Sequence, residues 1–68
     1  MKELDIVEVI INKTNYNDKG IFKGMRGVIM SEKKIDGKWE VVFSDNKTGE
    51  DTAVIMISEE DLMVVYRG

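Results

Sequence analysis

Two glycines three positions apart run directly into an apolar segment at residues 22–30, Phe-Lys-Gly-Met-Arg-Gly-Val-Ile-Met. Glycine accepts positive φ and lets another backbone come close, so this spacing predicts a tight turn that leads the chain into a sheet. We expect a strand from about Arg26 to Glu32. Glycine loops also bind phosphates, but the known pattern leads into a helix and this one leads into a strand. Gly24 and Gly27 are therefore predicted to serve backbone conformation and strand packing.

Four further segments are rich in the β-branched and aromatic residues that favour strands. They cover residues 4–11, 39–43, 52–57 and 62–66. Side chains alternate between the two faces of a strand. In the first segment, Val7 and Val9 are therefore predicted to point inward. In the second, Trp39, Val41 and Phe43 share the face that we assign to the core.

The segments between these strands carry turn-forming residues. Residues 12–20 contain three asparagines, an aspartate and a glycine, which predicts a long loop. Its one aromatic residue, Tyr16, is expected to fold back over the core, and a binding role at the loop tip is the alternative. Asp36-Gly37 is a strong signal for a tight hairpin turn. Ser58 to Asp61 has the Ser-x-x-Asp pattern of a helix start, but so few residues follow that we expect one short 3₁₀ turn.

Five short strands in a chain without proline predict an all-β fold, a small β-barrel formed by one domain over residues 1–68. A chain of 68 residues buries only about 60% of the surface that its unfolded form exposes, so the core must be compact. The first and last strands are expected at the edges of the sheet, where they could pair with another chain.

The sequence contains no cysteine and no histidine. These absences exclude a disulfide, a thiolate metal site and a Ser-His nucleophile pair, and they remove the preferred ligands of zinc. A chain this small also has little room for a substrate cleft. We therefore expect no enzyme activity, no metal and no cofactor. The charged start at residues 1–5 and the absence of any run of about 18 apolar residues predict a cytoplasmic protein without a membrane segment.

The order of these signals resembles the SH3-like small β-barrels of bacteria. The resemblance rests on Leu-Asp-Ile-Val-Glu-Val at residues 4–9, Lys-Gly-Met-Arg-Gly-Val-Ile at 23–29 and Trp-Glu-Val-Val-Phe at 39–43. Over about residues 4–66 the chain is similar to the KOW-type domains of ribosomal and transcription-elongation proteins, and to related uncharacterised small bacterial proteins. The resemblance implies a five-stranded SH3-like barrel with a long first loop and a short 3₁₀ turn before the last strand.

The resemblance also implies an alternative function, that of a nucleic-acid (RNA) binding protein. In KOW proteins that bind RNA, basic residues flank the glycine turn, and Lys23 and Arg26 match that pattern. Lys33 and Lys34 follow in the next loop, and these four cations could neutralise about four phosphates. Trp39 could stack on a base, whereas its place on the strand favours the core.

Charge is distributed unevenly along the chain, whose net charge is −3. Residues 1–39 hold eight basic and six acidic side chains, whereas residues 40–68 hold two basic and seven acidic ones. An acidic surface would complement a basic protein partner. Residues 53–57, with Met30 and Met63, supply more apolar side chains than one face of a small barrel needs, which indicates a contact patch.

The function that the sequence favours is a non-catalytic protein-interaction module, such as an inhibitor or adaptor, present as a monomer or homodimer. A plainer explanation of the acidic residues is that hydrophilic turns keep a small protein soluble. A calcium loop is not predicted at residues 45–49, because the alternating acids and the terminal glutamate of that pattern are missing. The candidate protein-binding residues are Glu50, Asp51, Glu59, Glu60, Asp61, Trp39 and Tyr16, and Asp45 lies in the same acidic part of the chain.

Overall fold

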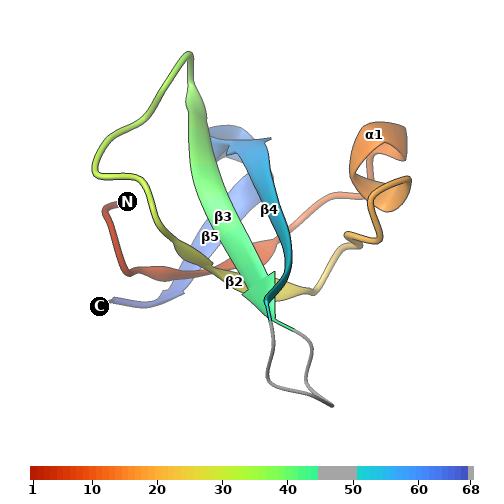
Figure 1. Ribbon diagram of the computed structural model, residues 1–68, viewed down its shortest axis with the longest axis horizontal. Helices are drawn as coiled ribbons and strands as arrows, with labels where there is room; N and C mark the ends of the chain where they lie inside the picture. The colour runs from red at the N-terminus through yellow and green to blue at the C-terminus, as the bar shows by residue number, and fades with distance from the viewer. Residues whose placement is uncertain (45–50, 68) are drawn as a thin grey trace.

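The computed structural model describes residues 1–44 and 51–67 (Figure 1). Its strands are β1 (Ile6–Val9), β2 (Arg26–Ile29), β3 (Lys38–Ser44), β4 (Asp51–Ser58) and β5 (Leu62–Tyr66). The short helix α1 spans Thr14–Asn17 in the first loop, and the 3₁₀ turn η1 spans Glu59–Asp61 between β4 and β5. The all-β fold and the 3₁₀ turn before the last strand are therefore confirmed. α1 adds a helical turn where the sequence predicts only a loop.

All strand pairs are antiparallel, and the strands lie in the order β4-β3-β2-β1-β5. The first four strands follow one another as neighbours, and β5 returns to pair with the free side of β1. β1 is therefore an interior strand, and the prediction that it lies at an edge is wrong. The edges are β4 and β5. The pattern of β1 alone could not show this, because its second neighbour is supplied by the far end of the chain.

The sheet is strongly twisted, so that β3 and β4 cross in front of β1 and β5 (Figure 1). The inward side chains of all five strands meet in one core, which consists of Val7, Val9, Ile29, Trp39, Val41, Phe43, Ile55, Ile57 and Leu62, with Tyr16 and Ile21 added by the first loop. The inward positions predicted in the first and third strands are confirmed, because these side chains are only 0–6% exposed. Each fully buried side chain of this size contributes about 1.5–3 kcal/mol to folding.

β1 and β2 are shorter than the sequence predicts. Leu4 has a φ of 72°, so the chain turns there, although its N–H still donates to the carbonyl of Ile29 at 2.8 Å. Just past β1, the N–H of Ile10 donates to the carbonyl of Asp61 at 3.0 Å, which ties this end of the strand to η1. Apolar residues next to the strand ends are exposed, so the run of apolar residues overestimates the length of the strand.

The predicted hairpin turn at Asp36-Gly37 is confirmed. Both residues have positive φ, 51° for Asp36 and 77° for Gly37, as the favoured two-residue hairpin turn requires. Ile35 and Lys38 exchange two backbone hydrogen bonds across the turn, with N···O distances of 2.8 and 2.9 Å.

Gly24 and Gly27 serve two different purposes. Gly24 has a φ of 94°, and its N–H donates to the carbonyl of Val9 at 2.8 Å. Gly27 lies within β2, where a Cβ would stand 2.7 Å from Cγ1 of Val41 and 2.8 Å from the carbonyl oxygen of Val42. These distances leave no room for a side chain, so Gly27 lets β3 pack closely on β2. The predicted roles in positive φ and close strand packing are confirmed.

Gly27→Ala should lower the free energy of unfolding by about 1–3 kcal/mol, because the added methyl group forces β2 and β3 apart. Urea denaturation followed by the fluorescence of Trp39 measures the change. Lys33→Ala is the matched control, since Lys33 is exposed and a surface change of this kind costs less than about 0.5 kcal/mol. Equal unfolding midpoints for the wild type and Gly27→Ala would contradict the packing role of Gly27.

Candidate functional site

Three polar side chains tie the first loop to η1. The carboxylate of Asp61 accepts hydrogen bonds from Nζ of Lys13 and from the hydroxyl of Tyr16, each at 2.7 Å. Asp61 and Tyr16 are both only 4% exposed. The Tyr16 hydroxyl also accepts a hydrogen bond from the N–H of Ser58 at 3.4 Å. A buried charge needs such partners, and these contacts hold α1 against η1.

The position predicted for Tyr16, folded back over the core, is confirmed. Asp61 differs from the prediction, which groups it with Glu59 and Glu60 on one acidic surface. In the structure its carboxylate is buried and paired with Lys13, so it is not part of an exposed face. The reason is the geometry of η1, because a 3₁₀ turn has about three residues per turn and directs consecutive side chains to different sides.

Opposing effects set the ionisation of this cluster. Burial works against the charge of Asp61, but the hydrogen bonds from Lys13 and Tyr16 outweigh it and hold the pKa of Asp61 below its ordinary value. Burial raises the pKa of the Tyr16 hydroxyl, and the bond to Asp61 raises it further. The same carboxylate raises the pKa of Lys13 through its hydrogen bond. Near pH 7 the cluster therefore holds an ionised carboxylate, a protonated amine and a neutral phenol.

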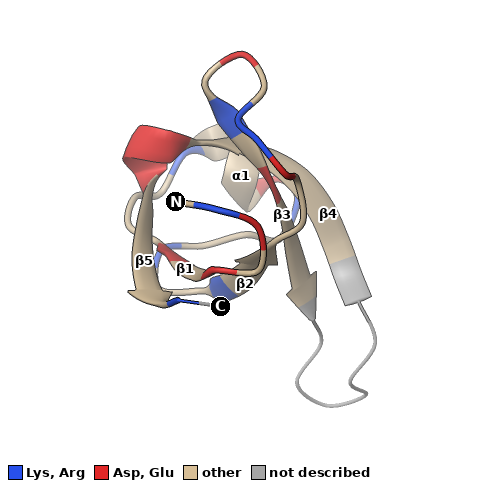
Figure 2. Cartoon of the chain, turned by 90° about the vertical axis from the view of Figure 1, so that its left-hand side faces the viewer, with Lys and Arg blue, Asp and Glu red and all other residues tan. Residues whose placement is uncertain are grey.

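The remaining predicted acidic residues lie in separate places. Glu59 and Glu60 lie in η1, the broad red turn directly before β5 in Figure 2. Glu60 is exposed, whereas Glu59 accepts a hydrogen bond from Nζ of Lys34, which lowers the pKa of Glu59. Asp45 and Glu50 lie outside the described residues, and Asp51 is described only as the first backbone position of β4.

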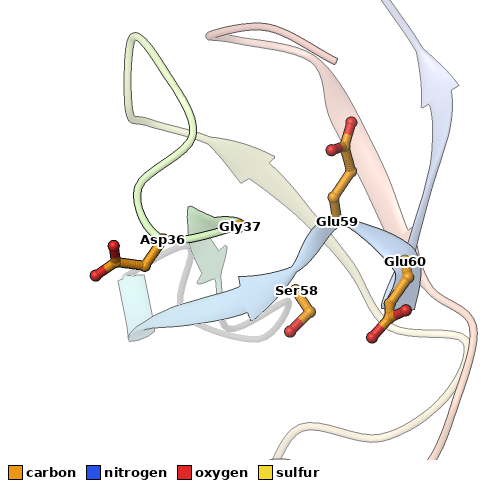
Figure 3. Close-up of a pocket in the computed structure, with 5 residues that line it drawn as sticks. All are labelled: Asp36, Gly37, Ser58, Glu59 and Glu60. Carbon is orange, nitrogen blue, oxygen red and sulfur yellow. The ribbon is translucent and has the colours of Figure 1, made fainter.

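A shallow recess beside η1 is lined by Asp36, Gly37, Ser58, Glu59 and Glu60 (Figure 3). Its three carboxylates point in different directions, so they do not converge on one position for a ligand (Figure 3). In the part of the chain that the structure describes, no group of three acidic side chains is arranged to hold a metal ion. The recess is a polar surface feature at the end of β4.

Trp39 lies in the core with 6% of its surface exposed, as its position along β3 predicts. Its indole N–H has no hydrogen-bond partner within residues 1–44 and 51–67. So little exposed surface leaves no face of the ring open for stacking on a base or on a partner.

The four cations of the alternative prediction do not form one cluster. Arg26 begins β2 and Lys23 lies in the turn before it, whereas Lys33 and Lys34 lie in the loop after the strand, whose four residues span roughly 13 Å. Nε of Arg26 pairs with Oε1 of Glu8 at 3.1 Å, and Lys34 pairs with an acid of η1. Lys23 and Lys33 are exposed and make no ion pair with any described residue.

The face of the sheet opposite the core carries apolar side chains across all five strands. The register pairs Val54 with Val42, Val42 with Val28, Val28 with Ile6 and Ile6 with Tyr66. Directly paired residues lie on the same face of a sheet, so these five residues form one line, termed here the outer apolar row. Its end members are the most exposed, Val54 at 57% and Tyr66 at 68%.

Sequence reasoning predicted an apolar excess but did not find this row. Met56 and Met63, which flank the row, are 37% and 47% exposed, and Met63 was part of the predicted patch. The row itself combines single residues from five strands, and only the register aligns them. One signal was present, because Val42 and Val54 occupy positions where a sheet with one solvated face carries polar residues.

These observations define a class of protein: a small all-β domain of five antiparallel strands whose solvent face carries an apolar row. Comparison of the chain with models of known protein families, with curated proteins and with solved structures finds no match. Within the described ranges, no helix has the length and apolar character needed to cross a membrane.

Asp61→Asn should lower the free energy of unfolding at pH 7 by about 1–3 kcal/mol, because it removes the ionised acceptor of a buried hydrogen bond from Tyr16 and a part-buried one from Lys13. The folded pKa of Asp61 is lowered, so its contribution to stability is fully present above about pH 4 and is lost as the pH falls through the folded value. The difference in urea midpoint between the wild type and Asp61→Asn should therefore narrow at acid pH.

Glu60→Gln is the matched control for this titration, because it removes an exposed carboxylate from the same turn. Its urea midpoint should follow that of the wild type throughout. A midpoint difference for Asp61→Asn that stays constant from neutral to strongly acid pH would show that the charge of Asp61 does not stabilise the fold.

Proposed function

We propose that this protein is a non-catalytic protein-interaction module that binds its partner through the outer apolar row. The observation that carries the proposal is the register, which aligns Val54, Val42, Val28, Ile6 and Tyr66 on the solvent side of the sheet. Neighbouring strands lie about 4.8 Å apart, so the row is about 19 Å long when it is followed along the curved sheet. Val54 and Tyr66 at its ends are exposed, and the three members between them are half-buried. Large contiguous apolar patches are uncommon on monomeric proteins and mark interaction sites.

The residues beside the row support a protein interface. Such interfaces have an apolar centre and a polar rim. Glu8 and Arg26 form a cross-strand ion pair next to the middle of the row, and Glu40 lies on the same face of β3. Met56 and Met63 widen the apolar part on the two edge strands. Methionine side chains are flexible and adapt to the shape of a partner.

We further infer that the sheet closes into the SH3-like barrel that the sequence resembles. The strand order supports this, because β1 to β4 form a meander and β5 pairs with β1 after a 3₁₀ turn. The crossing of β3 and β4 over β1 and β5 brings the inner faces together (Figure 1). A barrel of this size fills its interior with side chains, which leaves the outer surface for binding.

A photoreactive amino acid placed at Val54 should form a covalent adduct with a specific protein in the cells that express this chain, because Val54 is exposed at one end of the row. Adducts are detected as mass shifts on denaturing gels and identified by mass spectrometry. Tyr66→Asp, at the other end, should abolish this adduct, because burying an unpaired charge in an apolar contact is costly.

The same photoreactive residue at Lys33 is the control for position, since Lys33 is exposed but lies outside the row. Tyr66→Asp should leave the free energy of unfolding within about 0.5 kcal/mol of the wild-type value, because the side chain is largely exposed. Equal adducts from Val54 and Lys33, or an adduct that Tyr66→Asp does not reduce, would overturn the proposal.

Nucleic-acid binding remains the alternative, and the pairing of Arg26 and Lys34 with acidic residues gives it less support. We therefore expect no change in the fluorescence anisotropy of a labelled single-stranded RNA when the protein is added at low salt. Binding that weakens steeply with salt, and that is lost in the double variant Lys23→Glu with Arg26→Glu, would favour the alternative instead.

A further inference from the structure

β4 is an edge strand, and the direction of its backbone groups follows from its neighbours. The N–H of Met30 donates to the carbonyl of Glu40, so the peptide groups of Glu40 point toward β2. These groups alternate in direction along a strand. The N–H and C=O groups of the next residue, Val41, therefore point toward β4, where they bond those of the paired residue Ile55. It follows that the N–H and C=O groups of Val54 and Met56 point away from the sheet.

Tyr16 closes this edge at one end. Ser58 has the same backbone orientation as Val54 and Met56, and its N–H donates to the Tyr16 hydroxyl at 3.4 Å. On the outward side, Val54 and Met56 make no backbone hydrogen bond to any residue that the structure describes. The open part of the edge thus consists of residues whose side chains belong to the outer apolar row or flank it.

The two edge strands differ in length. Both pair through a register shift, β5 with β1 and β4 with β3, but β4 has eight residues whereas β5 has five. Apart from Asp51 at its first position, β4 carries no charged residue and no proline. A long, uncharged, apolar edge of this kind favours strand addition.

We propose that the β4 edge accepts an extended segment of another protein, which joins the sheet as a sixth strand. This inference rests on the proposed interaction module and names how the partner is held. Backbone hydrogen bonds to Val54 and Met56 supply affinity, and side chains of the added strand continue the outer apolar row by one position. The added strand runs along the edge and meets the row only at Val54, which belongs to both, so other parts of the partner cover the rest of the row.

The end of the segment that lies beside η1 carries a basic residue. There Asp36 and Glu60 line the recess next to Ser58 (Figure 3), and neither forms an ion pair with a described residue. The two carboxylates point in different directions (Figure 3), so they favour a lysine or arginine here through the acidic charge of this end of the edge, without converging on its side chain. A second copy of this chain is a poorer occupant, because each copy has a net charge of −3 and like charges oppose association.

A random dodecapeptide library displayed on phage and selected on the immobilised full-length protein is the probe. Selected peptides should carry apolar residues at every second position and Lys or Arg at one end. Val54→Pro removes an outward N–H without touching the bonds to β3, and edge strands tolerate proline. It should weaken binding of a selected peptide by about tenfold or more, whereas the control Lys33→Ala should not. Failure to select any such peptide, or equal binding by Val54→Pro, would overturn the inference.

Methylation of the peptide's backbone nitrogens tests the same hydrogen bonds in an unaltered protein. Methyl groups on alternate residues should abolish binding, and the complementary set, offset by one residue, should not, because only one set of N–H groups faces β4. On binding, the exchange of the Val54 and Met56 amides with solvent should slow by up to about tenfold. The exchange of the Ile55 amide, which is bonded to β3 in both states, should change little. Equal effects of the two methyl sets would contradict strand addition.

One further variant separates this inference from the proposed function. A photoreactive residue at Tyr66 reports binding of the partner to the row from the end opposite β4. If that residue captures the partner equally well with Val54→Pro, the row binds without the edge, and only the strand-addition inference is overturned. If neither Val54 nor Tyr66 captures a protein, the proposed function itself is overturned.

Discussion

The arrangement of this small domain depends on the hydrogen bonds that the buried carboxylate of Asp61 accepts. This carboxylate is buried, ionised near pH 7 and held by Lys13 and Tyr16. The carbonyl of the same residue accepts the N–H of Ile10 at 3.0 Å. One residue therefore joins the first loop, the end of β1 and η1. Since β5 begins at the next residue, this junction directs the last strand to β1 and leaves β4 with a single neighbour.

The return of β5 to β1 also shapes the solvent face. Ile6 becomes an interior member of the outer apolar row, with Val28 on one side and Tyr66 on the other. The core uses only one face of each strand, yet this chain is apolar along one line of the opposite face as well. Charged residues make up 34% of the sequence and offset the poor solubility of such a surface. The row ends at the open edge of β4, so Val54 belongs both to the row and to the edge.

Features that depend on neighbouring residues were predicted well. Alternation identified the inward side chains of β1 and β3, and Asp36-Gly37 identified the hairpin because few other residue pairs accept two positive φ values. The last strand has the predicted bounds, 62–66. Asp61 was misplaced because its partners Tyr16 and Lys13 lie 45 and 48 positions away. At such a distance, nothing near Asp61 in the sequence distinguishes it from the exposed acids beside it.

The chain's own residue order was enough to locate the five strands, the Asp36-Gly37 turn, the two glycine roles and the inner face, because side-chain alternation and backbone preference act over a few positions. It also identified the charged residues by type, but type does not tell which of them are paired. The structure alone established the interior place of β1, the ion pairs of Arg26 and Lys34, the open edge of β4 and the outer apolar row. Each of these depends on the register between strands that are distant in the sequence, and register is a property of the folded sheet.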